Sequence, residues 1–120
     1  MAEILRCQDR WGRMVILHDD TWYEKILMDH AEVPDNPSMV EEVIQDPDRQ
    51  NFDALSPNGE NFYRRRVLQH PYDMDYLKVV VRFAVTESSS EAIGTVVSAY
   101  SSVHYRKAGE RHKWSRSTQY

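Results

Sequence analysis

The chain has 120 residues, of which 41% are hydrophobic and 28% charged, and its formal net charge is -4. These values are typical of one folded domain covering residues 1–120, and they exclude a disordered chain. No stretch approaches the ~20 apolar residues of a membrane-spanning helix, and the start, Met1-Ala2-Glu3, does not resemble a signal peptide. The single cysteine, Cys7, excludes an internal disulfide and a multi-cysteine zinc site. We therefore expect a cytoplasmic domain without membrane contact, monomeric or in a small homo-oligomer.

The charges are unevenly distributed along the chain. Residues 19–60 carry two basic and twelve acidic side chains, whereas residues 61–120 carry ten basic and five acidic ones. Segregation of this kind indicates a face that binds a polyanion. The alternative is that the acidic segment only keeps one side of the domain soluble, and composition alone favours that alternative.

The N-terminal region predicts a hairpin followed by a helix. Residues 3–9 and 13–18 are expected to form two short strands, with Gly12 in the turn between them. The run Asp19-Asp20-Thr21 is a helix start signal, because an aspartate side chain can accept a backbone N–H of the first turn. We expect this helix to continue to about Ala31.

A second helix is expected after the break at Pro34-Asp35-Asn36-Pro37. Asn36 can cap it, with Pro37 at its first position, and Pro47 ends it. Its apolar residues have the spacing of one buried helical face: Met39, Val40, Val43 and Ile44.

The rest of the chain predicts strands joined by polar turns. Ser56-Pro57-Asn58-Gly59 is a strong turn signal, and Ser88-Ser89-Ser90-Glu91 reads as a polar connection. From about residue 104 onward we expect a basic, polar tail. The expected strands are 49–56, 61–68, 76–86 and 92–101. Helices followed by hairpin-linked strands predict an α+β fold, with two N-terminal-half helices packed on one face of a twisted antiparallel sheet.

Two basic segments are candidates for binding phosphate. Arg64, Arg65 and Arg66 follow one another on a predicted strand, and the guanidinium fork suits phosphate. The alternative is an edge strand that carries positive charge against aggregation, and the two interpretations have equal weight. The tail mixes cations with aromatic rings, a pattern that can neutralise phosphates and stack bases, although disordered ends are also basic. Its candidate RNA-binding residues are Arg106, Lys107, Arg111, Lys113 and Trp114.

Hydroxyl groups and histidines supply the other candidates. Ser98 and Tyr100 share one face of the last predicted strand, where a hydroxyl and a phenol can form a polar site. The alternative, which the sequence alone favours, is a strand that turns polar as it leaves the sheet. If this face lies with Arg82, alternation predicts that it is the one the helices leave open. For proton transfer His30 and His104 are better placed than the other histidines, His18, His70 and His112. The sequence contains no zinc-binding, glycine-rich phosphate-binding or serine-hydrolase motif, so we expect no metal and no cofactor.

The order of these features resembles a family of small phage- and plasmid-borne nuclease domains grouped with barnase, EndoU, the tRNase colicins and RelE. The resemblance covers residues 19 to 114. This chain departs from the family pattern at Lys25 and Ala31, where the family often has histidine and proline, and at Ser98, where it often has threonine. The segments that carry the resemblance are Trp22 to Ile26, His30 and Glu32, Val40 to Ile44, Gln45-Asp46-Pro47-Asp48, Phe62-Tyr63-Arg64, Leu77 to Val81 and Val96 to Tyr100.

The resemblance implies a metal-independent endoribonuclease, commonly the toxin of a toxin–antitoxin pair, with RNA as substrate and a cognate antitoxin as partner. The reaction would be attack by a ribose 2′-OH on the adjacent phosphate, which needs a base, an acid and cations. We assign phosphate binding to Arg64, Arg65, Arg66 and Lys107, proton transfer to His30 or His104, and positioning to Ser98 and Tyr100. The alternatives are a catalytically inactive RNA- or partner-binding module on the same fold, and an inhibitor or adaptor that uses its acidic helical face.

Overall fold

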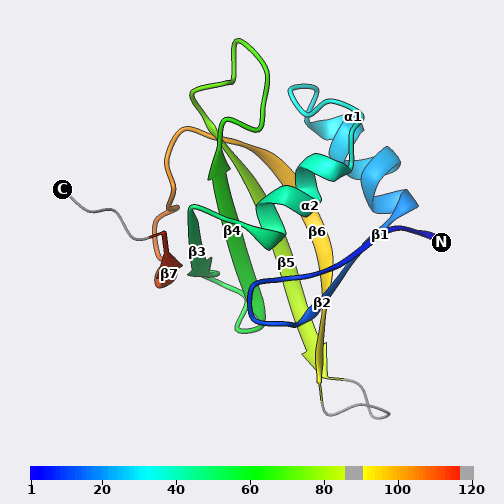
Figure 1. The fold of residues 1–120 in the computed structure, drawn as a ribbon, viewed down its shortest axis with the longest axis vertical. Helices are drawn as coiled ribbons and strands as arrows, with labels where there is room; N and C mark the ends of the chain where they lie inside the picture. Colours follow the sequence, from blue (N-terminus) through cyan, green and yellow to red (C-terminus); the bar gives the residue numbers. More distant parts are fainter. Residues whose placement is uncertain (86–90, 117–120) are drawn as a thin grey trace.

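The computed structural model describes residues 1–85 and 91–116 and consists of one seven-stranded sheet with its helices on one face (Figure 1). Three parts of the expected elements lie outside the described residues: residue 86 of the expected strand 76–86, Ser88 to Ser90 of the expected connection, and residues 117–120 of the expected tail. The strands are β1 (Glu3–Gln8), β2 (Met14–His18), β3 (Arg49–Phe52), β4 (Gly59–Arg65), β5 (Tyr76–Val85), β6 (Ala92–Ser102) and β7 (Arg111–Ser115). The helical elements are a π-helical segment η1 (Thr21–Ile26), a single turn α1 (Leu27–Asp29) and α2 (Ser38–Gln45). No helix within the described residues is long and apolar enough to cross a membrane.

The sheet is mixed, which corrects the expectation of a fully antiparallel one. Its strand order is β1-β2-β6-β5-β4-β3-β7. Every neighbouring pair is antiparallel except β2 and β6, which run parallel from Met14 beside Ile93 to Ile16 beside Thr95. The chain leaves β2 through the helices and returns through the meander β3 to β6, so no turn links the two strands and none fixes their relative direction.

The helices bury one face of this sheet. In Figure 1, α2 lies across β4 and β5, with β1 and β2 to one side and β3 and β7 to the other. Short helices are not stable alone, so this packing is what stabilises them. Fully burying one large apolar side chain contributes about 1.5–3 kcal/mol. The fully buried side chains of this core include Trp22, Ile26, Val40, Val43 and Ile44 from the helices and Phe62, Leu77 and Val79 from the sheet.

The helix starts differ in detail from the expectation. The side chain of Asp20 accepts the N–H of Thr21, as an aspartate at a helix start should, but the helix ends at Asp29 rather than Ala31. The second helix begins one residue after Pro37, and no side chain caps it. The carboxamide oxygen of Asn36 instead accepts a hydrogen bond from the hydroxyl of Ser38 at 2.6 Å, so it does not cap a backbone N–H of the helix.

Three strand boundaries also differ, each for a local reason. β3 ends at Phe52, because the carboxylate of Asp53 accepts the N–H groups of Leu55 and Ser56 and begins the turn there. β4 ends at Arg65, because Arg66 adopts a φ of +65°, which no strand continues through. The expected tail contains β7, which pairs antiparallel with β3.

The pairing registers define the two faces of the sheet. Phe62, Val79 and Ala99 lie side by side on β4, β5 and β6 and face the helices. Their neighbours Lys78 and Tyr100, and with them Tyr63, therefore lie on the opposite face. Ser98, paired with Val80, and Arg82 share that face, which is the one that alternation predicted for them.

Candidate active site

The rings of His30 and Tyr100 are stacked at the edge of the face opposite the helices. Their centroids are 5.0 Å apart and their planes differ by 28°. His30 follows α1, and Tyr100 lies near the end of β6. They meet because β2 pairs with β6 only as far as Thr95, while η1 packs against β6. The side chain of His30 remains 29% exposed, so solvent and ligands can reach it.

Glu32 holds the loop that carries His30 against β6. Its Oε2 accepts the backbone N–H of Ser101 at 2.9 Å and the Ser101 hydroxyl at 3.1 Å. Partial burial alone would raise the pKa of Glu32, but these hydrogen bonds outweigh it and hold the pKa below its ordinary value. Nδ1 of His30 is 3.9 Å from the same carboxylate oxygen. The carboxylate thus satisfies an edge N–H of β6 and lies beside the imidazole.

A buried polar cluster lies next to Tyr100 on the same face. Nζ of Lys78 donates to Glu110 at 3.0 Å, and the two side chains are only 4% and 1% exposed. The phenol of Tyr63 and the amide of Asn51 donate to the same carboxylate at 2.7 and 3.0 Å. Nζ of Lys78 is also 5.5 Å from the ring centroid of Tyr100. Sequence reasoning missed this cluster, although one signal was present: Lys78 stands between apolar residues, after Leu77 and before three valines.

The protonation states of this cluster follow from its contacts. Burial opposes ionisation of Glu110, but the donors from Asn51, Tyr63 and Lys78 prevail and lower its pKa. Burial, together with the neighbouring carboxylate, raises the pKa of Tyr63 far above its ordinary value. Glu110 is therefore the anion and Tyr63 the neutral donor near pH 7. The cluster fixes the segment 103–110 over this side of the sheet, and Asn51 also donates to the carbonyl of Tyr105 within it.

The three consecutive arginines do not act as one group. Arg64 faces the helices, where its guanidinium is 2.8 Å from the carboxylate of Asp46 and 3.4 Å from that of Glu42. Arg65 lies on the opposite face, with its guanidinium 4.5 Å from the ring centroid of Tyr76. Tyr76 lies two residues before Lys78 on β5 and therefore on the same face. Arg65 and Tyr76 thus continue the row of side chains on this face that includes Lys78 and Tyr100.

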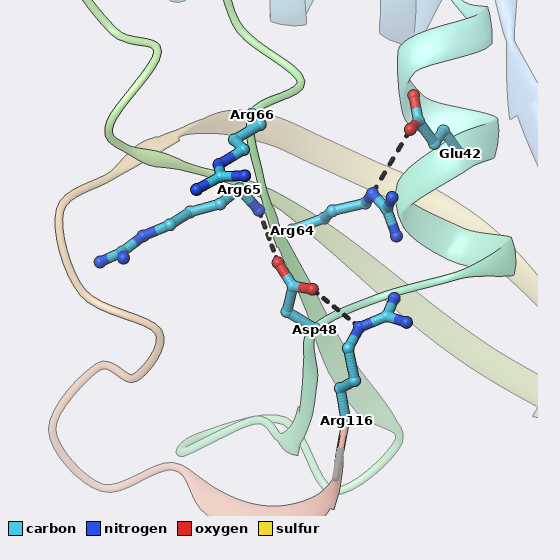
Figure 2. A pocket seen from close by; sticks show the side chains of 6 residues that line it. All are labelled: Glu42, Asp48, Arg64, Arg65, Arg66 and Arg116. Atoms are coloured by element: carbon cyan, nitrogen blue, oxygen red, sulfur yellow. Dashed lines mark hydrogen bonds and ion pairs between the residues drawn. The ribbon is translucent and has the colours of Figure 1, made fainter. Parts of the chain in front are cut away.

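A cationic pocket of about 340 Å³ opens where β4 ends (Figure 2). Four arginines and two carboxylates line it: Arg64, Arg65, Arg66, Arg116, Glu42 and Asp48. Figure 2 shows Arg64 directed toward Glu42 on α2, whereas Arg65 and Arg66 are directed away from the helix. Asp48 accepts the backbone N–H of Arg65 and the Nε of Arg116, at 2.8 and 3.1 Å. Arg116 belongs to the expected basic tail but is not among the residues assigned to RNA binding, since nothing in the sequence indicated that it would meet the arginine strand.

The remaining histidine and hydroxyl candidates occupy different positions. Ser98 is 9% exposed and lies two residues before Tyr100 on the same face. His104 is exposed at the start of the segment 103–110, and its carbonyl accepts the hydroxyl of Ser102 at 2.6 Å. The structure therefore stacks His30 on Tyr100 and places Ser98 on the same strand face as Tyr100. Within the described residues, no hydrogen bond, ion pair or ring contact joins His104 to these three residues.

The cations expected to bind RNA through the tail are also divided. Arg106 and Lys107 are exposed in the segment 103–110. Arg111 lies over the ring of Phe52, at 5.2 Å from its centroid. Nζ of Lys113 donates instead to the buried carboxylate of Glu60 at 2.8 Å.

Trp114 lies in a stack with residues of the first hairpin. The guanidinium of Arg10 is 3.5 Å from the centroid of Trp114 and 5.5 Å from that of Trp11. The indole N–H of Trp11 donates to the side chain of Gln50 at 3.1 Å. This stack joins the β1–β2 turn to β7, so Trp114 has a structural partner that the sequence did not indicate.

Within residues 1–85 and 91–116, no group of three or more histidine, cysteine or carboxylate side chains is arranged to hold a metal ion. Comparison with protein-family models, with curated proteins and with solved structures finds no match for this chain.

Proposed function

We propose that the chain is a metal-independent endoribonuclease of the cytoplasm, on a fold similar to that of barnase and RelE. The observation that carries the proposal is the stack of His30 on Tyr100, on the same sheet face as Arg65. An imidazole, a phenol and a guanidinium on one face are the kinds of group that attack by a 2′-OH on phosphorus needs. Tyr100 and Arg65 lie on strands, and the hydrogen bonds of Glu32 hold the loop of His30 against β6, so the geometry of these groups is fixed.

The reaction divides the work among these residues. A base removes the proton of the ribose 2′-OH as the oxygen attacks the adjacent phosphorus, and an acid protonates the departing 5′-oxygen. We assign one of these proton transfers to His30 and the positioning of the phosphate to the phenol of Tyr100. Arg65 faces the same side and would stabilise the charge that develops on the phosphate oxygens. The products are a 2′,3′-cyclic phosphate and a 5′-hydroxyl.

The test is cleavage of total RNA by the purified chain in excess EDTA. We expect fragments with cyclic phosphate ends, and we expect the double variant His30→Asn, Tyr100→Phe to leave the RNA intact. Tyr23→Phe is the matched control, because Tyr23 is 51% exposed on η1. The proposal fails if EDTA abolishes cleavage and magnesium restores it, if the products carry 5′-phosphates, or if the double variant cleaves like the wild type.

One observation favours a second candidate, an RNA- or partner-binding module without catalysis. Arg64 is paired with Glu42 and Asp46 of the acidic region around α2, which makes it a structural residue as much as a ligand-binding one. Such a module would bind single-stranded RNA with an affinity that falls with salt, by a slope of about -0.7 per neutralised phosphate, and would cleave nothing.

The role as a toxin with a cognate antitoxin is part of the same proposal. It predicts that induced expression of the wild-type chain stops bacterial growth, whereas the double variant His30→Asn, Tyr100→Phe, expressed to the same level, does not. Equal growth arrest by both chains would separate toxicity from RNA cleavage.

A further inference from the structure

The arginine pocket contains two arginines whose guanidinium groups pair with acids and two, Arg65 and Arg66, whose guanidinium groups form no ion pair within the described residues. Arg64 is fixed by Glu42 and Asp46, and Arg116 is fixed by Asp46 and Asp48, at 2.6 and 3.1 Å. These two guanidinium groups and three carboxylates form a wall with a net charge of -1. The guanidinium groups of Arg65 and Arg66 supply the surplus positive charge of the pocket.

The backbone of Arg66 gives a second reason to regard the pocket as a ligand site. Its φ of +65° is a left-handed conformation that costs a residue with a Cβ about 1 kcal/mol or more. Glycine or asparagine would adopt it at a lower cost. Arginine at this position therefore destabilises the local backbone relative to glycine, but it places a guanidinium on the rim of the pocket.

The pocket and the His30–Tyr100 stack lie on different sides of β4. Arg64 faces the helices, whereas Tyr100 belongs to the opposite face. Arg65 is the residue between them, because it lines the pocket and lies over Tyr76 in the row that leads to Tyr100. A phosphate held in the pocket is therefore a different one from a phosphate that reacts beside His30.

We propose that the pocket is a second phosphate subsite, which binds a phosphate of the same RNA strand outside the reacting position. This inference rests on the proposed ribonuclease function. Planar guanidinium groups recognise phosphate oxygens through paired hydrogen bonds, and those of Arg65 and Arg66 line the pocket without a carboxylate partner among the described residues. The subsite gives the chain a preference for strands over dinucleotides, without reading the identity of any base.

The substrate series that tests this subsite is a dinucleotide, with one phosphate, against a hexanucleotide of the same scissile step. Arg66→Gln removes one of the free cations, and Lys25→Gln on η1 is the matched control, since it changes the net charge equally at an exposed site remote from β4. We expect Arg66→Gln to lower kcat/KM on the hexanucleotide by roughly tenfold more than on the dinucleotide, as for one charge-assisted hydrogen bond. Equal losses on both substrates, or a loss matched by Lys25→Gln, would overturn the subsite.

A binding measurement keeps this test separate from the ribonuclease proposal. A hexanucleotide with 2′-deoxyribose at every position cannot be cleaved by 2′-OH attack, so its affinity can be measured whether or not the chain is a nuclease. We expect Arg66→Gln to weaken its binding and to reduce the salt slope by about 0.7, one phosphate on a single strand. If the wild type binds this strand and Arg66→Gln binds it with the same affinity and slope, the subsite is wrong even if RNA is cleaved. If the wild type does not bind it at all, the subsite is wrong as well.

Discussion

The ring of His30 is stacked on the ring of Tyr100 at the stretch of β6 that β2 leaves unpaired. Three features set this geometry: the sheet places Tyr100, the helical segment packs against β6, and Glu32 ties the following loop to Ser101. The two rings are thus positioned by contacts that do not depend on a ligand. A site preorganised in this way is expected to lose activity, and little stability, when one functional group is removed.

Replacing Tyr100 by phenylalanine tests the phenol alone. The aromatic ring and its stack on His30 remain, and only the hydroxyl is lost. We expect kcat on an RNA oligonucleotide to fall by about 10²-fold, while the free energy of unfolding in urea changes by less than about 1.5 kcal/mol. Tyr23→Phe should change neither quantity. A Tyr100→Phe chain that cleaves at the wild-type rate would exclude the phenol from the mechanism and leave the fold unaffected.

Replacing each of the two candidate histidines decides between them. His30→Asn removes the stacked imidazole, and we expect a loss of 10² to 10⁴ in kcat, the range of about one general acid or base. His104→Asn changes an exposed residue that shares no hydrogen bond or ring contact with Tyr100 in the described part of the chain. We expect less than about a threefold change, since surface substitutions of this kind perturb little. The reverse order of the two losses in a single-turnover assay would move the proton transfer to His104.

Much of the framework could be predicted from local patterns. The turn at Gly12, the start at Asp20 and the apolar face of the second helix are each set by neighbours in the sequence. Alternation along β5 and β6 placed Ser98 and Tyr100 on the face opposite the helices, because a strand has a period of two. Local rules of this kind do not fix which strands become neighbours, and the parallel pairing of β2 with β6 was therefore missed.

The parts of the site that were missed depend on residues distant in the chain. Arg64, Arg65 and Arg66 were all assigned to phosphate binding, but the acids around α2 hold Arg64 and a left-handed backbone at Arg66 ends the strand. The expected tail forms β7 because β3 offers it an edge, and basic residues alone do not reveal that edge. A long-range partner likewise explains how Lys78 is accommodated in an apolar strand, since Glu110 neutralises it.

Removing only one charge of the Lys78–Glu110 pair is expected to lower the free energy of unfolding strongly. Glu110→Gln leaves the ammonium group of Lys78 buried without a counter-charge, and we expect a loss of about 3–5 kcal/mol in urea unfolding. The double variant Lys78→Met, Glu110→Gln removes both charges, and we expect it to be more stable than Glu110→Gln alone. Strictly additive losses in this double-mutant cycle would show that the two charges do not interact.

The buried carboxylate of Glu60 is expected to make the stability of the fold depend on pH in the acid range. Arg13 donates both of its Nη groups to this buried carboxylate, at 2.7 and 2.9 Å, and Lys113 donates at 2.8 Å. Burial alone would raise the pKa of Glu60, but these donors lower it from 4.5 to about 2. The unfolded chain therefore binds the proton at a higher pH than the folded chain does. The resulting stabilisation is fully present above the unfolded pKa and is lost as the pH falls toward the folded value.

We expect the carboxylate of Glu60 to account for up to about 3 kcal/mol of the stability that the wild type loses between about pH 5 and pH 2. Other carboxylates with lowered pKa values, among them Glu32 and Glu110, contribute to the same loss of stability at low pH. The measurement is therefore a difference: urea unfolding across this range for the wild type and for Glu60→Gln. Glu60→Gln should be less stable than the wild type at neutral pH. It should lose less stability on acidification, because glutamine at position 60 has no carboxylate to protonate. Glu24→Gln, at an exposed position of η1, is the matched control and should keep the wild-type slope. If the stability of Glu60→Gln falls as steeply with decreasing pH as that of the wild type, the contacts with Arg13 and Lys113 do not lower the pKa of Glu60 in solution.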